Sequence, residues 1–433
     1  MVKRKLIVIY LFVSMFVYGY AQGNSSPFHA VVAEDGSGDY TSIQKAIDMA
    51  PDNSATPWLI FVKNGSYKEQ VFIPKTKPNI HLIGQDKDKT IIHHRLNVGG
   101  KPDDNTPNEK RGYWEYSVHN PASEMYKCEG AVVRIEGSHF YSENISYIND
   151  WGVDFQSGPQ ALAMNTQADC VAFNNCIFRS FQDTWMTSMK NDANRIYARD
   201  CWIEGAVDYF YGGGDALLEN CTFYNVRSGS VIVAPSHKTA KYGYVFRDCT
   251  IDGSSAAADG KQKLGRPWHN SPRAIYIHTT MRIPVAPEGW ANMGAVPALF
   301  AEYDSRDQEG NVLDLSLRKT EYEGRGENAP KGSCPASITR EEADGYVYEN
   351  IIHGNDGWNP RAMMDRLPAP ENIKFQEGKV TWMAIPEVTG YIVFDGENIV
   401  GFTTKTSCVL SGTVTALSIC GINRHGSLGL KSQ

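Results

Sequence analysis

The side chains of this sequence that could carry out a reaction are a small set of glutamines, aspartates and one arginine. They are Gln160, Gln182, Asp183, Asp208 and Arg266. The spacing from Gln160 to Gln182 is similar to that from Asp183 to Asp208. Two neighbouring carboxylates oppose each other's ionisation, and an adjacent arginine makes them unequal, so that one can act as an acid and the other as an anion. Primary amides can donate hydrogen bonds to a developing oxyanion, although they cannot act as acid or base.

Other common catalytic patterns are absent from the sequence. It contains no Gly-x-Ser-x-Gly segment of the α/β-hydrolase type and no His-Glu-x-x-His or Cys-x-x-Cys pair. The adjacent His93 and His94 cannot both face one metal ion from a strand, because successive side chains point to opposite faces. The residues therefore favour carboxylate chemistry and give no support for a metal site.

A degenerate repeat indicates how these side chains are positioned. An Asn or Asp followed by Cys and a short alternating strand recurs at similar intervals, and Asn144-Ile145 fits the same frame one step earlier. The copies begin at Asn175-Cys176, Asp200-Cys201, Asn220-Cys221 and Asp248-Cys249. A repeat of this length, with no helical pattern between its copies, predicts a parallel β-helix, in which equivalent residues of successive coils stack. The spacings between the two glutamines and between the two aspartates each match about one coil. Carboxylates one coil apart would then lie about 5 Å apart.

The two ends of this solenoid need covers. Residues 41–50 predict a short helix with Thr41 or Ser42 as N-cap and an apolar face of Ile43, Ala46, Ile47 and Ala50. At the other end we expect the polar segment 318–366 to wrap the last coils.

A proline-rich linker, residues 367–370, precedes short alternating runs that predict a small antiparallel β-sandwich similar to a fibronectin type III module, with Trp382 in its core. The predicted fold class is all-β: a right-handed single-stranded parallel β-helix over 27–317, the wrapping segment 318–366, and the sandwich over 367–433.

The N-terminus predicts the compartment. Lys3-Arg4-Lys5 precedes an apolar run from Leu6 to Val17 and the small-residue pattern Gly19-Tyr20-Ala21, which is typical of a secretory signal peptide over residues 1–21. We expect an exported protein, secreted or periplasmic, that does not insert into a membrane. The net charge of −7 gives no basis for a nucleic-acid partner, and we expect a monomer.

The nine cysteines leave their pairing open. Cys201 and Cys221 occupy equivalent positions one step of the repeat apart in an exported protein, so we predict a disulfide between them. A stack of reduced, buried cysteines is the alternative.

The sequence resembles the pectin methylesterases (pectinesterases, carbohydrate esterase family eight) from about residue 29 to about residue 303. The resemblance rests on VVAEDGSGDY at 31–40, GSYKE at 65–69, GPQALA at 158–163, QDT at 182–184, GAVDYFYG at 205–212 and LGRPW at 264–268, in the order and spacing of the family. It implies a right-handed parallel β-helix that hydrolyses the C6 methyl esters of galacturonate in homogalacturonan. It also implies pectin as the partner and neither a metal nor an organic cofactor.

The resemblance also assigns roles to single residues. By motif, Asp208 matches the nucleophile and Asp183 the acid and base, while Gln182 and Gln160 match the oxyanion-hole amides. Arg266 matches the partner of the nucleophile, which agrees with the chemistry of the residues themselves, because a guanidinium would keep Asp208 ionised. In the substrate groove, Trp268 matches a residue that stacks on sugar, with Tyr211 and Val207 as further candidates.

Departures from the family pattern concern the groove. Phe210 stands where Ile or Val is usual, Met186 replaces a common Tyr, and Met293 stands where a second Trp is frequent. The segment 212–215 is unusually rich in glycine, and the insertion from about Asn97 to Cys128 has no clear counterpart. We therefore leave the preferred pattern of methylation open.

Two other functions remain compatible with the residues. One is a different pectin-active β-helix enzyme, a lyase or a glycosidase, which would need clustered carboxylates for Ca²⁺ with a basic proton abstractor, or two to three carboxylates without paired glutamines. The other is a non-catalytic polysaccharide-binding protein that binds without turnover.

Overall fold

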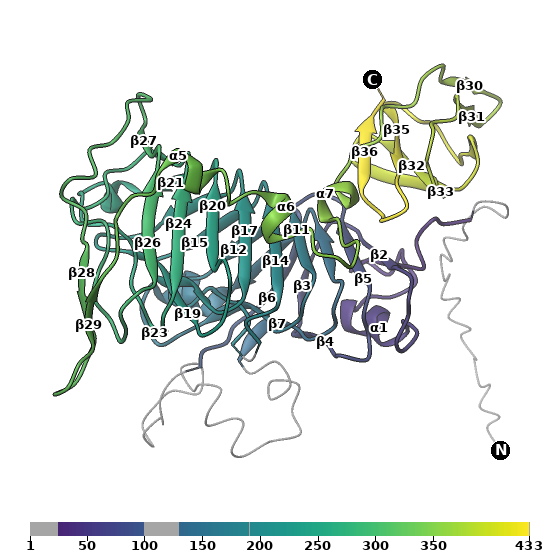
Figure 1. The fold of residues 1–433 in the computed structure, drawn as a ribbon. Coiled ribbons are helices and arrows are strands. Elements are labelled where there is room, and N and C mark those ends of the chain that lie inside the picture. Colours follow the sequence, from purple (N-terminus) through teal and green to yellow (C-terminus); the bar gives the residue numbers. More distant parts are fainter. Residues whose placement is uncertain (1–24, 99–129, 190, 433) are drawn as a thin grey trace, which may run out of the picture. The chain divides into compact units, whose positions relative to one another are not determined.

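Three long parallel sheets form most of the chain. In the computed structural model, which describes residues 25–98, 130–189 and 191–432, the strands of successive coils enter the same three sheets in turn (Figure 1). Sheet A consists of β1 (Ala30–Val32), β2 (Trp58–Val62), β5 (Ile80–Gly84), β8 (Tyr141–Glu143), β11 (Val171–Asn174), β14 (Arg195–Arg199), β17 (Asp215–Glu219), β20 (Tyr244–Arg247), β24 (Arg273–Ile277) and β26 (Leu299–Tyr303).

The other two sheets complete each coil. Sheet B consists of β3 (Gly65–Lys68), β6 (Thr90–His94), β9 (Ser146–Asn149), β12 (Ile177–Arg179), β15 (Trp202–Gly205), β18 (Thr222–Asn225), β21 (Thr250–Gly253), β25 (Thr280–Met281) and β27 (Arg306–Asp307). Sheet C consists of β4 (Val71–Ile73), β7 (Ala131–Ile135), β10 (Leu162–Thr166), β13 (Trp185–Met186), β16 (Val207–Gly212), β19 (Val231–His237) and β22 (Lys263–Gly265), with β23 (His269–Asn270) paired to β19. The predicted right-handed parallel β-helix is confirmed.

The repeated Asn or Asp marks one corner of each coil, between sheets A and B. These residues have left-handed backbone conformations, with φ of 58° at Asn144, 51° at Asn175, 58° at Asp200, 51° at Asn220 and 54° at Asp248. Asn and Asp tolerate this conformation better than other residues with a side chain. The repeat in the sequence is therefore a repeated turn.

The cysteine after each corner points into the coil. Cys176, Cys201, Cys221 and Cys249 are all buried and carry free thiols. The backbone N–H of Cys176 donates to Cys201 Sγ at 3.5 Å, and that of Cys201 donates to Cys221 Sγ at 3.4 Å. The predicted disulfide between Cys201 and Cys221 is wrong, because stacked side chains run parallel and each sulfur accepts from the preceding coil instead of meeting its neighbour. The alternative, a reduced stack, is confirmed.

Aromatic rings fill the coils beneath the catalytic candidates. Trp185 stacks on Phe178 with ring centroids 4.2 Å apart and meets Phe210 edge-on at 5.2 Å. All three are fully buried. Because side chains alternate along a strand, these inward rings fix β13 and β16 with Met186 and Tyr211 on the outer face. Truncating such a ring to alanine typically costs about 3–5 kcal/mol, so this core holds the outer face in place.

The predicted N-terminal cover is confirmed. Helix α1 (Ile43–Asp48) has Ser42 as its N-cap, whose side chain accepts from the backbone N–H of Lys45. Its Ile43, Ala46 and Ile47 are buried against the first coil. Glu69 strengthens the cap by accepting from the Ser42 hydroxyl at 2.8 Å and the Ile43 N–H at 2.8 Å.

The segment after the last coil runs back along sheet A. It contains the hairpin β28 (Glu321–Glu323) and β29 (Lys331–Ser333) and the short helices α5 (Arg340–Ala343), α6 (Tyr348–Ile351) and α7 (Pro360–Met363). Arg361 pairs with Glu219 of β17 at 2.6 Å, and Arg195 of β14 pairs with Asp356. Figure 1 shows α5 and α6 beside β20 and β17. The segment thus extends further back than the last coils.

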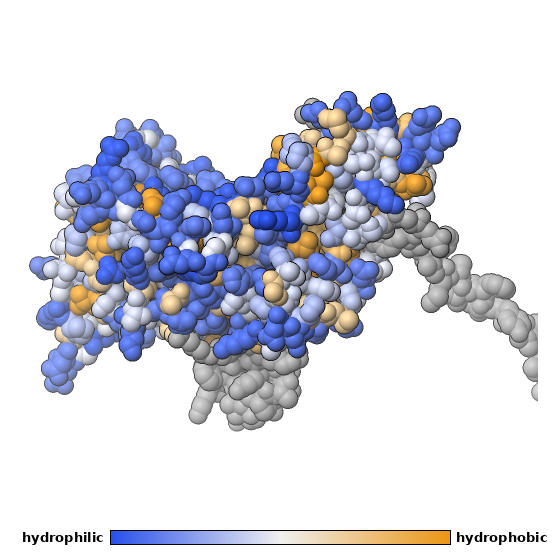
Figure 2. Space-filling view, turned by 45° about the vertical axis from the view of Figure 1, so that its right-hand side comes forward, coloured by the Kyte–Doolittle hydropathy of each residue, from blue (hydrophilic) through white to orange (hydrophobic). Residues whose placement is uncertain are grey.

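Among the described residues, two further helical turns lie between strands of the β-helix. They are α4 (Asp150–Phe155), after β9, and a 3₁₀ turn at Ser255–Ala257, after β21. In the described part of the chain, no helix is long and apolar enough to cross a membrane. The face in Figure 2 is mostly hydrophilic, with small scattered apolar patches.

The C-terminal residues form antiparallel sheets, as predicted. One has three strands, β30 (Lys374–Gln376), β31 (Lys379–Thr381) and β34 (Ser407–Val409); the other has four, β33 (Asn398–Thr403), β32 (Gly390–Asp395), β35 (Leu417–Ile422) and β36 (Leu428–Lys431). Trp382 is buried and meets Tyr391 edge-on at 5.0 Å, so its predicted place in the core is confirmed. The likeness to a fibronectin type III module stays a prediction.

The chain divides into two compact units at Leu367 and Pro368, but residues 422–429 belong to the unit of 28–367. Asn423 donates to the carbonyl oxygens of Met363 and Asp365 at 3.0 Å, and the hydroxyls of Ser427 and Tyr141 are 2.9 Å apart. The predicted boundaries at 317 and 366 stay predictions. The signal peptide, and the insertion beyond Val98, lie outside the described residues.

Candidate active site

Three successive coils of sheet C bring the predicted carboxylates and amides together. Gln182 pairs with Val207, and the N–H of Asp183 donates to the carbonyl oxygen of Val207 at 2.9 Å, so Asp183 lies beside Asp208. One coil earlier, the N–H of Ala161 donates to the carbonyl oxygen of Gln182 at 3.0 Å, which places Gln160 beside Gln182. Each of the two spacings noted in the sequence therefore corresponds to one coil.

The backbone is irregular at both aspartates. The φ angle is 62° at Asp183 and 49° at Asp208, in the left-handed region. The register between β16 and β19 shifts between Val207 and Phe210, so a bulge lies at Asp208. A bulge redirects a side chain relative to the regular pleat, and such conformations persist where the surrounding structure holds them. Here the aromatic core beneath β13 and β16 supplies that support.

Asp208 and Arg266 form a bidentate ion pair. Arg266 Nε donates to Asp208 Oδ1 at 2.8 Å, and Arg266 Nη2 donates to Asp208 Oδ2 at 2.6 Å. Arg266 follows β22, two coils after Asp208, and its N–H donates to the carbonyl oxygen of Val233 on the intervening coil. Burial lowers the pKa of the Arg266 guanidinium, but the hydrogen bonds and charge of Asp208 outweigh it, and the net direction is upward. The pair fixes the plane of the carboxylate and balances its charge.

The surroundings of Asp183 disfavour its ionised form, whereas Asp208 has a cation beside it. Burial, followed by the charge of Asp208, raises the pKa of Asp183 well above its usual value. Hydrogen bonds from Tyr211 and Gln182 and the charge of Arg266 offset part of this rise. One carboxyl is thus paired with a cation while its neighbour is held toward the protonated form. The sequence predicts such an inequality between the two carboxyls, and their roles as anion and acid stay predictions.

The two residues that carry the amides lie on adjacent coils and are not fully buried. Gln160 and Gln182 are both half-buried, and the carbonyl oxygen of Gln160 accepts from the N–H of Val98 at 2.7 Å. A Cβ atom on residue 158 would lie 2.8 Å from Gln182 Oε1, so the glycine at 158 leaves room for that side chain. Half-exposed amide groups on adjacent coils can donate to an oxygen of a bound group.

An apolar floor lies next to the aspartates. It is formed by outward-facing residues of sheet C, namely Ala131, Leu162, Tyr211 and Ala234, with Val98, Met186 and Trp268 packed against them. The rings of Tyr211 and Trp268 have centroids 5.7 Å apart at 61°. Val207, the remaining groove candidate, is half-buried at the start of β16.

Sequence reasoning missed Leu162 and Ala234 as members of this floor. An apolar residue in a strand is usually interpreted as core, and these two face outward. Ala234 follows Val233, which points into the core, and this alternation between adjacent residues is the pattern that could have revealed its outward position. It also missed that the Tyr211 hydroxyl contacts Asp183.

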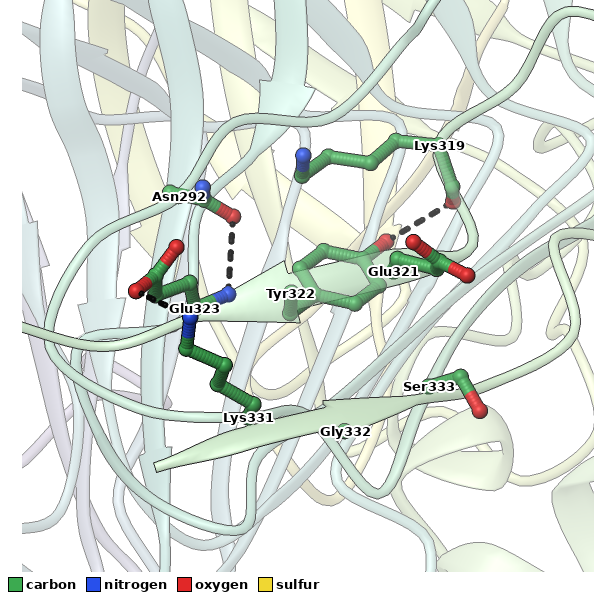
Figure 3. A pocket seen from close by; sticks show the side chains of 8 residues that line it. All are labelled: Asn292, Lys319, Glu321, Tyr322, Glu323, Lys331, Gly332 and Ser333. Atoms are coloured by element: carbon green, nitrogen blue, oxygen red, sulfur yellow. Dashed lines mark hydrogen bonds and ion pairs between the residues drawn. The ribbon is translucent and has the colours of Figure 1, made fainter. Parts of the chain in front are cut away.

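Two surface hollows lie outside this constellation. One, of about 570 Å³, lies on the hairpin β28–β29, where Lys331 pairs with Glu323 at 3.0 Å and Asn292 accepts from the Glu323 N–H (Figure 3). The other, of about 580 Å³, lies at the ends of β19 and β23. Neither hollow is lined by the predicted catalytic residues.

One cluster of metal-ligand type occurs among the described residues. It consists of Asp169, Cys170 and Asp356. Arg195 lies among them, donating to Asp169 at 2.8 Å and to Asp356 and Cys170. The arrangement is that of a guanidinium held by two carboxylates, and it joins β14 to the wrapping segment.

Comparison with known proteins finds a matching family model and related sequences. The Pectinesterase family model matches residues 29–106 and 117–318. The chain is 31% identical over 336 residues to a pectinesterase of Petunia integrifolia, covering 74% of this chain and 81% of that protein. It is 33% identical over 283 residues to Pectinesterase 31 of Arabidopsis thaliana, covering 63% and 80%.

Solved structures resemble the β-helix unit. The pectin methylesterase from carrot superposes with a TM-score of 0.59 at 25% identity, covering 76% of this chain and 93% of that chain. The pectin methylesterase PemA from Erwinia chrysanthemi superposes with a TM-score of 0.56 at 21% identity, covering 76% and 98%, and this likeness concerns the fold.

Proposed function

The chain belongs to the pectinesterase family and hydrolyses methyl esters of pectin, and we propose that it does so with Asp208 as the nucleophile and Asp183 as the acid and base. The observation that supports these roles is the contrast between the two neighbouring carboxyls. Asp208 is held by both nitrogens of the Arg266 fork, whereas burial and the charge of Asp208 raise the pKa of Asp183.

In the first half of the reaction, a carboxylate oxygen of Asp208 attacks the carbonyl carbon of the galacturonate methyl ester. The carbonyl oxygen becomes an oxyanion, to which the amides of Gln160 and Gln182 donate hydrogen bonds. As the bond to the methoxy group breaks, protonated Asp183 gives its proton to that oxygen, and methanol leaves. The products are methanol, a galacturonyl-Asp208 anhydride and an ionised Asp183.

In the second half, water attacks the galacturonyl carbon of the anhydride. Ionised Asp183 accepts a proton from this water, and the same two amides stabilise the second oxyanion. The bond to Asp208 breaks, which restores its carboxylate and releases a galacturonic acid that ionises in solvent. Asp183 is protonated again, so the cycle closes without a further group.

Trp268 and Tyr211 support binding of the sugar next to these carboxyls. Their rings pack together in the apolar floor, and aromatic rings are suited to the apolar faces of sugars. Val207 stands at the start of the Asp208 strand, where we expect it to contact the reacting sugar.

The test is methanol release from esterified pectin by wild type and by Asp208→Asn, with Asp252→Asn as control. Asp252 is also an aspartate beside an arginine, at 3.3 Å from Arg282, but it lies on sheet B. We expect a loss of at least about 10³-fold for Asp208→Asn and less than about twofold for Asp252→Asn. Methanol release by Asp208→Asn at the wild-type rate would contradict the assignment.

A second measurement addresses the covalent intermediate. Hydroxylamine added during turnover should divert the anhydride to galacturonyl hydroxamate with wild type and not with Asp208→Asn. The same mixtures are assayed for unsaturated ends, which a lyase would produce, and for reducing ends, which a glycosidase would produce.

We propose in addition that the protein is exported after removal of residues 1–21, which is supported by their sequence pattern. Sequencing the N-terminus of the protein recovered outside the cytoplasm should then find Gln22 first. A mature protein that still begins with Met1 would contradict export by this route.

A further inference from the structure

A serine, a histidine and an aspartate form a chain of hydrogen bonds on the outer face of sheet B, whereas the proposed groove lies on sheet C. Ser66 Oγ is 3.0 Å from His93 Nε2, and His93 Nδ1 is 2.6 Å from Asp150 Oδ2. Ser66 belongs to β3 and His93 to β6, which are neighbouring parallel strands (Figure 1), and Asp150 begins α4. A Ser-His-Asp triad is recognised by this geometry, because the order of its members along the chain differs between unrelated folds.

The two partners of the His93 ring determine where its proton lies. An ionised carboxylate only accepts hydrogen bonds, so Asp150 holds the proton of the neutral ring on Nδ1. Nε2 then has a free lone pair and accepts the hydroxyl hydrogen of Ser66. The Ser66 hydroxyl is thus aligned to give its proton to His93 as it attacks, which is how a serine nucleophile is activated.

Contacts outside the triad hold its two ends in place. The backbone N–H of Ser66 donates to Glu34 Oε2 at 2.8 Å. At the other end, Asp154 of α4 pairs with Arg95, which directly follows β6. This ion pair ties α4, and with it Asp150, to the strand that carries the histidine.

The triad is open to a substrate. Ser66 is exposed, and the side chains of His93 and Asp150 are 20% and 31% exposed. Ile91 lies directly opposite Ser66 on the same outer face and is half-buried. This single apolar side chain beside the hydroxyl suits a small acyl group such as acetyl, whose methyl group it can contact.

Lys68 supplies a positive charge on the same face. It lies directly opposite His93 and two residues after Ser66, which is about 6.6 Å along the strand. It is exposed, and in the part of the chain that the structure describes its ammonium group has no carboxylate partner. Its long side chain can reach the oxygen that becomes negative when Ser66 attacks a carbonyl group. The N–H of Ser66 is not free for this purpose, because it donates to Glu34.

We propose that Ser66, His93 and Asp150 form a second catalytic site, which hydrolyses esters of short-chain carboxylic acids. In the first step Ser66 Oγ bonds to the carbonyl carbon, and its proton moves to His93 Nε2. The oxyanion is stabilised by Lys68, and Asp150 balances the charge of the imidazolium. As the ester bond breaks, His93 gives the proton to the departing alcohol, which leaves an acyl-Ser66.

Water completes the reaction. It attacks the acyl carbon while His93 takes one of its protons, and the bond from that carbon to Ser66 Oγ then breaks. His93 returns the proton to Ser66 Oγ, and the carboxylic acid is released. The net reaction consumes one ester and one water and produces one alcohol and one acid, so no further reactant is needed.

The experiment measures hydrolysis of p-nitrophenyl acetate by the Asp208→Asn protein, so that the proposed pectin site does not contribute. Adding Ser66→Ala or His93→Gln should lower the rate at least about 100-fold in each case, because Gln cannot accept the proton. Combining the two should lower it no further, since residues of one catalytic unit are not additive. The octanoate ester should react more slowly than the acetate. An unchanged rate with Ser66→Ala, or a faster reaction of the octanoate, would overturn the proposal.

Ser228→Ala and His278→Ala are the matched controls. Ser228 is an exposed serine that donates to Asp259 at 2.6 Å, in a contact without a histidine. His278 pairs with Asp304 at 2.9 Å, in a contact without a serine. Both variants should keep the rate within about twofold. A loss in either control as large as that of Ser66→Ala would show that the effect is not specific to the triad.

Covalent labelling separates catalysis from a purely structural contact. A fluorophosphonate bonds to an activated serine oxygen and releases fluoride, so wild type should be labelled at Ser66. Asp150→Asn should lower the labelling rate at least about tenfold, because His93 loses the partner that fixes its proton. Asp154→Asn removes the other ion pair that joins α4 to β6, and it should keep the rate within about twofold. An equal loss in both variants, or no label on Ser66 in wild type, would mean that the triad only holds α4 in place.

Discussion

Removal of the Tyr211 hydroxyl should shift the pH dependence of the enzyme in a defined direction. Tyr211 is a buried ring on β16 whose hydroxyl donates a hydrogen bond to the Asp183 carboxyl. A donor favours the ionised form of a carboxyl, so this contact lowers the pKa of Asp183 while burial and the charge of Asp208 raise it. Tyr211→Phe keeps the ring beside Trp268 and removes only the donor. The pKa of Asp183 should therefore rise further.

The size of the shift follows from the strength of one hydrogen bond to a charged group. Such bonds contribute about 1.5–3 kcal/mol, and one pKa unit corresponds to about 1.36 kcal/mol. Asp183 is half-buried, so water can replace part of the lost contact. We therefore expect a rise of about one unit, at the lower end of the range that the bond strength allows.

The assay is kcat/KM for methanol release across the pH range, with chemical de-esterification subtracted. In the proposed mechanism Asp183 must carry a proton until methanol leaves, so loss of that proton produces the alkaline limb of the profile. For Tyr211→Phe this limb should move to higher pH by about one unit. Tyr224→Phe is the control, because Tyr224 stacks on Trp202 on sheet B with centroids 4.7 Å apart, away from both aspartates.

An alkaline limb that stayed in place, or moved to lower pH, would refute this reasoning. It would mean either that Asp183 is not the group that titrates there or that the Tyr211 hydroxyl does not stabilise its ionised form. Circular dichroism and the unfolding temperature of both variants exclude a general loss of structure as the cause.

Three further outcomes are expected. Arg266→Ala should lower the rate of methanol release at least about 100-fold and move the alkaline limb to higher pH, since the Arg266 charge lowers the pKa of Asp183. Arg266→Lys should restore part of the rate, because it keeps the charge without the planar fork. An Arg266→Ala enzyme of normal rate would contradict the role of the pair. Asp183→Asn should raise the unfolding temperature at pH 7 by roughly 2 °C, and by less at pH 4. The pKa of Asp183 is raised in the folded state, so this carboxyl lowers the stability of the wild-type protein as pH rises from about 4 toward that pKa. Calorimetry at both pH values checks this. A chain ending at Leu367 should keep methanol release per folded molecule but unfold at a lower temperature, because it lacks residues 422–429, which pack with the β-helix unit. An unchanged unfolding temperature would show that these residues contribute nothing to the stability of the β-helix unit.

Much of the fold was predictable because each coil of a β-helix requires similar residues at equivalent positions, so the sequence repeats at the length of a coil. Each coil needs a corner that tolerates a left-handed backbone, and Asn144, Asn175 and Asp200 mark successive corners in the sequence. The N-terminal cover was predictable for a similar reason, because Ser42 and the apolar residues of α1 lie within one short segment. Such information is local, so it survives without knowledge of the tertiary structure.

The relative positions of the catalytic candidates follow from the same period. Asp183 and Asp208 lie on adjacent coils, as their spacing in the sequence predicts, and Gln160 and Gln182 do so as well. The assignment of Arg266 to Asp208 came from the family resemblance, and the structure forms that pair. The roles of these residues in catalysis stay proposals.

Three features were decided only by tertiary structure. The cysteines of adjacent coils do not bond, because stacking makes their side chains parallel, and the sequence alone gives spacing without direction. The Tyr211 hydroxyl meets Asp183 of the preceding coil, and the same strand, β16, carries a bulge; both depend on packing between coils. Residues 422–429 pack with the β-helix, although the chain left that unit at Leu367, through hydrogen bonds from Asn423 and Ser427. A periodic sequence determines which residues stack, whereas the direction of each side chain and contacts between distant segments depend on how the whole chain packs.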